Sequence, residues 1–319
     1  MRKDGDVDLP VICLLGPTAS GKSGLAVRMC VRLGREGHPA EIINTDSMVV
    51  YRGMDIGTAT PTLSEQRAVK HHLVSIRDVT EPFSIVGMQT LARQATDDCL
   101  SRGVIPVLVG GSALYTKAVI DEMAVPPTDP KVRARWQKRL DAEGPEALHE
   151  ELARRDPRAA ESILPGNGRR IVRALEVIEL TGSFAATIPD GTYHWPATVQ
   201  IGLELPREDM DRRIEQRVDQ MWDDGLVDEV RALDDVGLRD GLTARRALGY
   251  RQVLEFLDGD YDEDEARRRT VTATRRFARK QLMWYRRDER IEWFNALDPD
   301  LDDKVVTRVL TALSGDEED

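Results

Sequence analysis

The chain has 319 residues, of which 41% are hydrophobic and 32% are charged, enough for one large or two modest domains with a buried core. Its formal net charge of −11 argues against nonspecific polyanion binding, and no apolar run approaches the ~20 residues that a membrane span needs. The cysteines at 13, 30 and 99 are too widely spaced for a disulfide framework or a zinc site, so we expect reduced core thiols in a cytoplasmic protein.

The first 120 residues alternate strand and helix patterns. Residues 1–8 carry three acids and no apolar stretch, so they do not resemble a secretory signal. We expect strands at 9–15, 41–45, 73–76 and 104–109, and helices at 21–33 and 84–101. Apolar strands separated by helices predict a parallel sheet that is covered on both faces.

From about residue 121 to 196 the pattern is helical only. Asp129-Pro130 and Asp156-Pro157 each fit an N-cap followed by proline in the first turn, and Gly144-Pro145 interrupts the region. A strand at 198–205 and helices at 208–223 and 263–285 then follow. We therefore expect an α/β core at 9–121 and 197–297, a small all-helical insertion domain at 122–196 and an acidic C-terminal tail at 298–319.

A phosphate-binding loop lies between the first strand and the first helix. It comprises Gly16, Pro17, Thr18, Ala19, Ser20, Gly21, Lys22 and Ser23 and fits the pattern G-x-x-x-x-G-K-[ST]. The glycines let backbone N–H groups surround phosphate oxygens, Lys22 supplies a positive charge, and the Ser23 hydroxyl can bind magnesium. The motif predicts a P-loop NTPase-like core that binds a phosphorylated ligand, with ATP as the ligand that the motif alone suggests.

The second acid of a nucleotide hydrolase has no clear counterpart. Such enzymes place a carboxylate after another buried strand to organise magnesium, but here the apolar run at 107–109 leads into Gly110-Gly111-Ser112. The acid in a comparable position is Asp46, which follows the strand at 41–45. Asp46 could serve magnesium, could act as a general base at the carboxyl edge of the sheet, or could cap a following helix with Ser47.

Basic residues are concentrated in two clusters despite the acidic average. Residues 267–290 contain ten arginines and lysines against two acids, and a second group comprises Arg154, Arg155, Arg158, Arg169, Arg170 and Arg173. Either cluster could be a solvated helix face. Together they favour a local site for a polyanion.

The motifs resemble those of the tRNA dimethylallyltransferases, also called tRNA isopentenyltransferases, of the bacterial type. The resemblance covers roughly residues 10 to 290. Matching segments are GPTASGKS at 16–23, DS at 46–47, VYRGMDIGTA at 50–59, HHL at 71–73, IRD at 76–78, LVGG at 108–111, RI at 170–171, RALEV at 173–177, RIEQR at 213–217, RALGYRQ at 246–252, ATR at 273–275 and KQ at 280–281. A zinc-finger extension of the kind seen in eukaryotic relatives has no counterpart in the sequence.

The resemblance implies transfer of a dimethylallyl group from dimethylallyl pyrophosphate to the exocyclic amine of the adenosine 3′ of a tRNA anticodon. It implies that Thr18 and Arg217 contact the pyrophosphate, with Arg213 one turn earlier, and that Asp46 is the general base. Expulsion of pyrophosphate needs cationic help, and the delocalised amine needs a proton acceptor, which is what these residues offer. Mg²⁺, with Ser23 as its side-chain ligand, is the expected cofactor.

The resemblance also implies tRNA contacts in three regions. They are Asp46, Ser47, Met48 and Val49; Ser112 and Arg133; and Arg169, Arg170, Arg173, Arg246 and Arg251. Val49 stands where glutamine is frequent, which weakens the case for a base contact there. Tyr51 and Tyr250 could stack on bases or pack in the core. We expect the anticodon stem-loop of tRNA as the partner, no membrane, and a monomer.

Three other readings of the motifs stay open at this point. A P-loop small-molecule kinase could use the helical insertion as a lid, a prenyltransferase could act on free adenine nucleotides, and a noncatalytic RNA-binding protein could sense nucleotide through the loop. ATP turnover would favour the first, competition between AMP and tRNA would separate the second, and nucleotide-dependent RNA binding would support the third.

Overall fold

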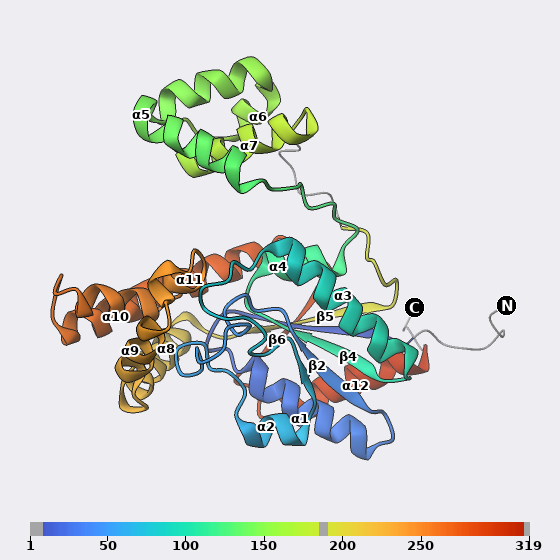
Figure 1. The fold of residues 1–319 in the computed structure, drawn as a ribbon. Coiled ribbons are helices and arrows are strands. Elements are labelled where there is room, and N and C mark those ends of the chain that lie inside the picture. Colours follow the sequence, from blue (N-terminus) through green and yellow to red (C-terminus); the bar gives the residue numbers. More distant parts are fainter. Residues whose placement is uncertain (1–8, 185–190, 316–319) are drawn as a thin grey trace. The chain divides into compact units, whose positions relative to one another are not determined.

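The computed structural model describes residues 9–184 and 191–315, and its chain divides into two compact units. The core unit comprises Met1–Asp121 and Tyr193–Asp319, and the helical unit comprises Glu122–Thr192 (Figure 1). The helical unit begins where the insertion was predicted to begin and ends four residues before the predicted end at 196.

A six-stranded sheet in the order β3-β2-β4-β1-β5-β6 forms the centre of the core unit. Its strands are β1 (Val11–Leu15), β2 (Ala40–Asn44), β3 (His71–His72), β4 (Ile105–Val109), β5 (Thr198–Glu204) and β6 (Ile291–Asn295). All neighbouring strands pair in parallel, with Cys13 opposite both Leu108 and Gln200. The structure thus confirms the α/β class. Parallel strands place all their carboxyl ends, where such folds bind ligands, along one edge.

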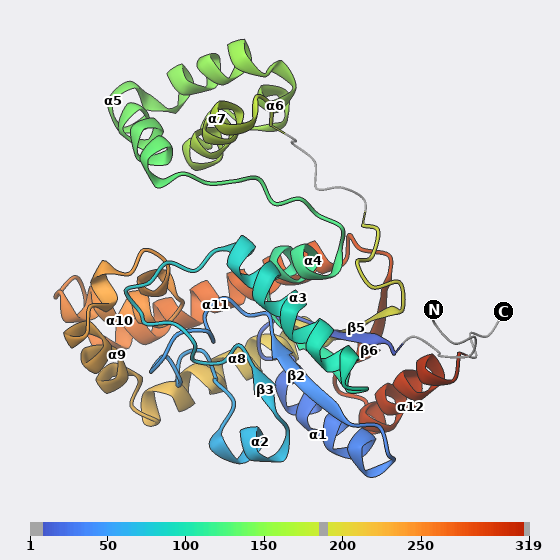
Figure 2. The same cartoon turned by 45° about the vertical axis from the view of Figure 1, so that its right-hand side comes forward.

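Helices cover both faces of the sheet (Figure 2). In chain order they are α1 (Lys22–Arg35), α2 (Leu63–Ala68), α3 (Ile85–Ser101), α4 (Ala113–Ile120), α8 (Arg207–Asp223), α9 (Leu226–Asp235), the short 3₁₀ helices η1 (Leu238–Asp240) and η2 (Ala244–Arg246), α10 (Tyr250–Leu257), α11 (Glu263–Tyr285) and α12 (Leu301–Ser314). Alternate side chains of β1 enter two different buried clusters. Cys13 packs on the α3 side and Ile12 on the side of α1 and α12, as the period of two in a strand requires.

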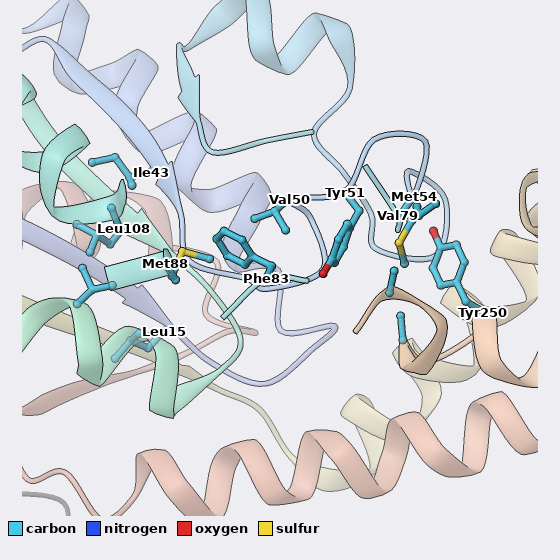
Figure 3. Close-up of a cluster of buried hydrophobic side chains, with 14 of the residues drawn as sticks. Leu15, Ile43, Val50, Tyr51, Met54, Val79, Phe83, Met88, Leu108 and Tyr250 are labelled. Atoms are coloured by element: carbon cyan, nitrogen blue, oxygen red, sulfur yellow. The ribbon is translucent and has the colours of Figure 1, made fainter. Parts of the chain in front are cut away.

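The larger cluster contains two tyrosines that the sequence left open as stacking partners. Tyr51 and Tyr250 are both 0% exposed and lie in the core beside Val50 and Met54 (Figure 3). Neither ring is accessible to a base, so the core-packing alternative is the correct one.

Two predicted elements differ from the structure. The strand expected at 73–76 is wrong, because β3 comprises only His71 and His72, and Leu73 and Ser75 adopt positive φ angles of 61° and 52° that turn the chain out of the sheet. Residues 298–319, expected as an acidic tail, contain α12, and β6 just before it was not foreseen. α12 is amphipathic, with Leu301, Val305 and Val306 buried and its acids outward.

The helical unit consists of α5 (Pro130–Arg155), α6 (Pro157–Ser162) and α7 (Gly168–Thr181) around its own small core. Asp129 accepts hydrogen bonds from the N–H groups of Lys131 and Val132, as the sequence predicted for this N-cap. Gly144 has non-helical backbone angles, with a φ of 82° and a ψ of 166°, so α5 consists of two helical segments joined by a kink, as Gly144-Pro145 predicted.

Candidate active site

The phosphate loop connects β1 to α1 at the carboxyl edge of the sheet. Gly16 has a φ of 151°, and a Cβ at this position would lie 2.8 Å from Ser20 Oγ, so the tight turn requires glycine here. Gly21, with a φ of 93°, precedes α1 and offers no side-chain cap. The N-terminus of α1 is therefore open to an anion, which its dipole favours.

Two desolvated cations flank this loop. The Lys22 ammonium donates to the Pro17 carbonyl at 3.2 Å, and Arg217 Nη1, from α8, donates to Thr18 Oγ1 at 3.2 Å. Burial lowers the pKa of Lys22 to about 8, with Asp46 opposing the shift and Arg217 adding to it. Burial likewise lowers the pKa of Arg217, against the field of Asp46. Neither cation forms an ion pair with another residue that the structure describes, so a bound anion would compensate their desolvation.

Arg213, one turn before Arg217 on α8, also lies beside the loop. Its Nη1 is 4.0 Å from the position that a Cβ on Gly21 would occupy. The sequence analysis predicted Arg213 near the pyrophosphate, and in the structure it lies beside the phosphate loop.

Asp46 follows β2 and is fixed by its own loop. Its N–H donates to Asn44 Oδ1 at 2.9 Å, while its Oδ1 accepts the Met48 N–H at 2.8 Å. No helix follows within residues 47–57, so the helix-cap alternative for Asp46 and Ser47 is wrong. The carboxylate forms an Asx-type turn and leaves Oδ2 outside that turn.

The loop after β4 borders this carboxylate. A Cβ on Gly111 would lie 3.6 Å from Asp46 Oδ2, and Ser112 directly precedes α4 without a side-chain cap bond. The ends of β1, β2 and β4 thus bring the phosphate loop, Asp46 and Ser112 to one edge of the sheet.

Gln281 was missed as a site residue by the sequence reading. It lies on the buried face of α11, where its Oε1 accepts the Thr18 N–H at 2.9 Å and its Nε2 donates to the Gly111 carbonyl. A glutamine on the apolar side of an amphipathic helix was the available signal, because a buried amide needs hydrogen-bond partners.

The loop at 50–59 is held in place by residues of α9 and α10. Glu229 accepts the N–H groups of Asp55 and Ile56 at 3.0 and 2.8 Å, and it also accepts the Tyr250 hydroxyl proton at 2.5 Å. A Cβ on Gly57 would overlap the Tyr250 ring, which explains the glycine. These contacts fix the polypeptide that follows Asp46.

Neighbours of Asp46 differ in their access to a ligand. Ser47 and Met48 are half-buried, whereas Val49 is 8% exposed. The side chain of Val49 therefore offers almost no surface for the tRNA contact expected of it.

The basic residues of the helical unit fall into two groups. Arg133 and Arg173 surround the buried carboxylate of Glu176, at 2.8 and 3.0 Å, and Arg173 also donates to the carbonyls of Pro126 and Pro127. Arg169 and Arg170 are exposed at the start of α7 and form no ion pair among the described residues. The second pair is thus the freer one for phosphates.

Arg246 and Arg251 lie in the core unit, where they line a pocket of about 340 Å³. Arg239 and Arg245 complete its basic wall, and Glu255 and Asp258 contribute acids. The structure brings these two predicted tRNA-binding arginines together at one surface depression.

Much of the arginine-rich segment at 267–290 is already paired. Arg268 and Arg269 bind Glu265, and Arg275 binds Glu215 at 2.7 Å. Arg290 binds Asp121 at 2.8 Å and stacks over Tyr193 at 4.3 Å. Arg276 and Lys280 are exposed and form no ion pair within residues 9–184 and 191–315.

Another side-chain cluster, Glu41, His72 and Cys99, has its ligand atoms within 4.8 Å of one another. Arg102 and Lys70 both pair with Glu41, at 2.7 and 3.3 Å, and hydrogen bonds from Arg102 lower the pKa of this carboxyl. Two cations in contact with the carboxylate oppose the binding of a divalent ion by this cluster.

No helix in the described part of the chain is both long and apolar enough to cross a membrane. Cys13, Cys30 and Cys99 are buried and unpaired, as predicted.

Comparison with protein families finds a match to the IPP transferase model over residues 49–288. A tRNA dimethylallyltransferase of Cutibacterium acnes is 81% identical over 319 residues, covering 100% of both chains. A tRNA dimethylallyltransferase of Thermobifida fusca is 56% identical, over 94% of each chain.

Solved structures show the same fold. A full-length tRNA isopentenylpyrophosphate transferase from Bacillus halodurans matches with a TM-score of 0.70 and 38% identity, over 96% of this chain and 97% of the other. A eukaryotic dimethylallyltransferase acting on tRNA matches with a TM-score of 0.75 over 97% of this chain and 79% of the other, at 24% identity, which speaks to fold alone.

Proposed function

Because the chain belongs to the IPP transferase family, we propose that it transfers a dimethylallyl group from dimethylallyl pyrophosphate to the exocyclic amine of the adenosine 3′ of the anticodon in tRNA. The observation that carries the proposal is the pairing of a cationic phosphate loop with the carboxylate of Asp46 at one edge of the sheet. The protein is a tRNA-modifying prenyltransferase, as are the tRNA dimethylallyltransferases and the tRNA isopentenylpyrophosphate transferase to which it is similar.

The leaving pyrophosphate is bound by the loop and its two cations. As the allylic C–O bond breaks, negative charge grows on the bridging oxygen, and Lys22 and Arg217 stabilise that charge without first reorganising. Thr18, whose hydroxyl Arg217 already contacts, contributes a further polar group. Since both cations are desolvated in the free protein, their interaction with an anion is stronger than it would be in water.

Asp46 accepts the proton from the attacking amine. As the N–C bond forms, the nitrogen becomes cationic, and one of its protons passes to the carboxylate while pyrophosphate departs with the electrons of the broken C–O bond. The turn formed by Oδ1 and the Met48 N–H fixes the orientation of the carboxylate and leaves Oδ2 for this role. The target base must first leave its stack, which costs a few kcal/mol.

Mg²⁺ is the cofactor that the donor set fits. Ser23 lies exposed in the first turn of α1, and a hydroxyl together with pyrophosphate oxygens is a ligand set that Mg²⁺ accepts. When bound, the ion would neutralise charge on the pyrophosphate. The Ser23 hydroxyl would be its side-chain ligand. The carboxylate of Asp46 lies at the same edge of the sheet.

The tRNA is held by arginines rather than by the average charge of the protein. In the helical unit Arg169 and Arg170 are exposed and form no ion pair with the residues described, and in the core unit Arg246 and Arg251 line the basic pocket. Contacts of this kind bind phosphates and set register without reading sequence. Ser112, which follows Gly111 in the loop that borders Asp46, would touch the nucleotide near the target base.

The test is prenylation without ATP. The protein is mixed with Mg²⁺, dimethylallyl pyrophosphate and an unmodified tRNA that carries adenosine 3′ of its anticodon, and the tRNA mass is measured. A gain of one prenyl group is expected, and no gain would overturn the proposal. Parallel reactions with AMP as acceptor, and with ATP in place of the donor, should give no product.

A further inference from the structure

Gln281 joins two loops of the active site through both ends of its carboxamide. Oε1 accepts the Thr18 N–H at 2.9 Å, Nε2 donates to the Gly111 carbonyl, and the residue is only 6% exposed. Building on the proposed function, we propose that Gln281 is a positioning residue that fixes the separation between the pyrophosphate-binding loop and the loop that borders Asp46.

The Thr18 end of this bridge belongs to the donor side. Thr18 is also the residue that Arg217 contacts, at 3.2 Å through its hydroxyl. A displacement of the Thr18 backbone therefore moves both the loop and the anchor of a cation that stabilises the leaving group. Without Gln281, the Thr18 N–H would lose its acceptor, and the loop would lose its tie to α11.

The Gly111 end belongs to the acceptor side. The Cβ position of Gly111 is 3.6 Å from Asp46 Oδ2. The same position is 2.5 Å from Gln281 Nε2, so any side chain here would displace the carboxamide. Gly111 does not have a positive φ, so the close approach of Gln281, rather than backbone conformation, is what requires glycine.

A rigid spacer between the two loops matters because the reaction joins two separately bound groups. The allylic carbon is carried by the pyrophosphate on one loop, and the amine is placed beside Asp46 next to the other. A misplacement of about 1 Å costs about 100-fold in rate. Both ends of the Gln281 carboxamide are occupied by protein groups, so its loss should lower kcat while substrate binding persists.

Gln281→Met tests the bridge, because methionine has a similar length but can neither donate nor accept these hydrogen bonds. We expect kcat to fall about 100-fold, with KM for the donor and Kd for tRNA changing less than about threefold. Gln200→Met is the matched control, because Gln200 is a buried glutamine of β5 that donates to the Tyr193 hydroxyl at 2.9 Å. It should lower thermal stability but leave kcat within about threefold.

A double-mutant cycle separates the bridge from general destabilisation. Gly111→Ala alone should lower kcat strongly by displacing the carboxamide, whereas Gly111→Ala combined with Gln281→Ala should be no more than about threefold slower than Gln281→Ala. Equal kcat for Gln281→Met and the wild type, or additive losses in the cycle, would overturn the inference. Failure of the wild type to prenylate tRNA would instead reject the proposed function, so the two outcomes are distinguishable.

Discussion

At the scale of single residues, Asp46 carries the chemistry of the acceptor. Asp46→Asn keeps the shape and the acceptor for the Met48 N–H but cannot take up a proton. We expect kcat to fall by about 10²- to 10⁴-fold. Single-turnover prenylation measures the rate, and filter binding of tRNA should show an affinity within about threefold of the wild type.

Asp228→Asn serves as the control for this change. Asp228 is exposed on α9 and pairs with Arg231, so its neutralisation should leave kcat unchanged. Wild-type turnover by Asp46→Asn would show that another group accepts the proton.

The lowered pKa of Lys22 leads us to expect that kcat/KM for the donor depends on pH. Burial lowers its pKa to about 8 in the free protein, and a bound pyrophosphate favours the charged form. Below pH 8 the ammonium is already charged, whereas above it binding must take up a proton. We therefore expect kcat/KM for the donor to decrease above about pH 8, with a limiting slope of about tenfold per pH unit. Steady-state kinetics between pH 6 and 10 measure this limb.

Lys22→Arg provides the control, because arginine stays charged across this range. Its maximum rate will be lower, since a guanidinium does not reproduce the ammonium geometry, but the alkaline limb should move upward or vanish. An unchanged limb in Lys22→Arg would assign the titration to another group.

At the residue scale, site residues could be predicted from the sequence where they belong to a short local motif. The loop at 16–23 and the aspartate after β2 follow from patterns that span a few residues. Gln281 lies in the matching segment KQ at 280–281, but its role could not be found from a local pattern, because its hydrogen bond to Thr18 joins residues 263 positions apart. The burial of Tyr51 and Tyr250 likewise depends on packing between distant segments.

At the scale of elements, α12 completes one face of the core. Val305 and Val306 are 0% and 1% exposed and pack in the cluster that contains α1. Val305→Ala with Val306→Ala removes four buried methyl groups, and at roughly 0.8 kcal/mol for each we expect a loss of about 3 kcal/mol in the free energy of unfolding. Urea denaturation followed by circular dichroism measures it.

Val236→Ala is the matched control, because Val236 is 64% exposed and should change stability by less than about 0.5 kcal/mol. A similarly small change in the α12 variant would mean that this helix does not contribute to the core.

The composition of α12 explains why the sequence reading missed it. Asp302 and Asp303 lie outward and pair with Arg28 and Arg32 of α1. The acids dominate the segment 298–319 when it is read as composition, and the few valines that cover the sheet are noticed only through their helical spacing. β6, with five residues and a partly exposed pattern, gave an even weaker signal.

At the scale of the whole molecule, an acidic protein has to bind a polyanion through local sites. The two basic clusters of the sequence suggested this, but the clusters themselves overstate the available charge, because many of their arginines are paired with carboxylates in the folded protein. Pairing across elements is not visible in a sequence. The domain boundary at residue 122, by contrast, could be predicted because alternating strands and helices give way there to helices alone.

Salt dependence of tRNA binding distinguishes paired from unpaired arginines. Arg169→Ala with Arg170→Ala removes two exposed cations that form no ion pair among the described residues. If each contacts a phosphate, the slope of log K against log salt should become shallower by about 1.4 to 1.8.

Arg154→Ala with Arg155→Ala removes the same formal charge from the same unit, but both arginines already pair with Glu151, at 2.7 and 2.6 Å. We expect this variant to change the slope by less than about 0.5, since few additional counterions are released from a carboxylate-paired guanidinium. Binding isotherms between 50 and 300 mM salt compare the two variants. Equal slope changes would show that tRNA responds to the total charge of the helical unit, whereas the expected difference identifies the start of α7 as the surface that binds the tRNA backbone.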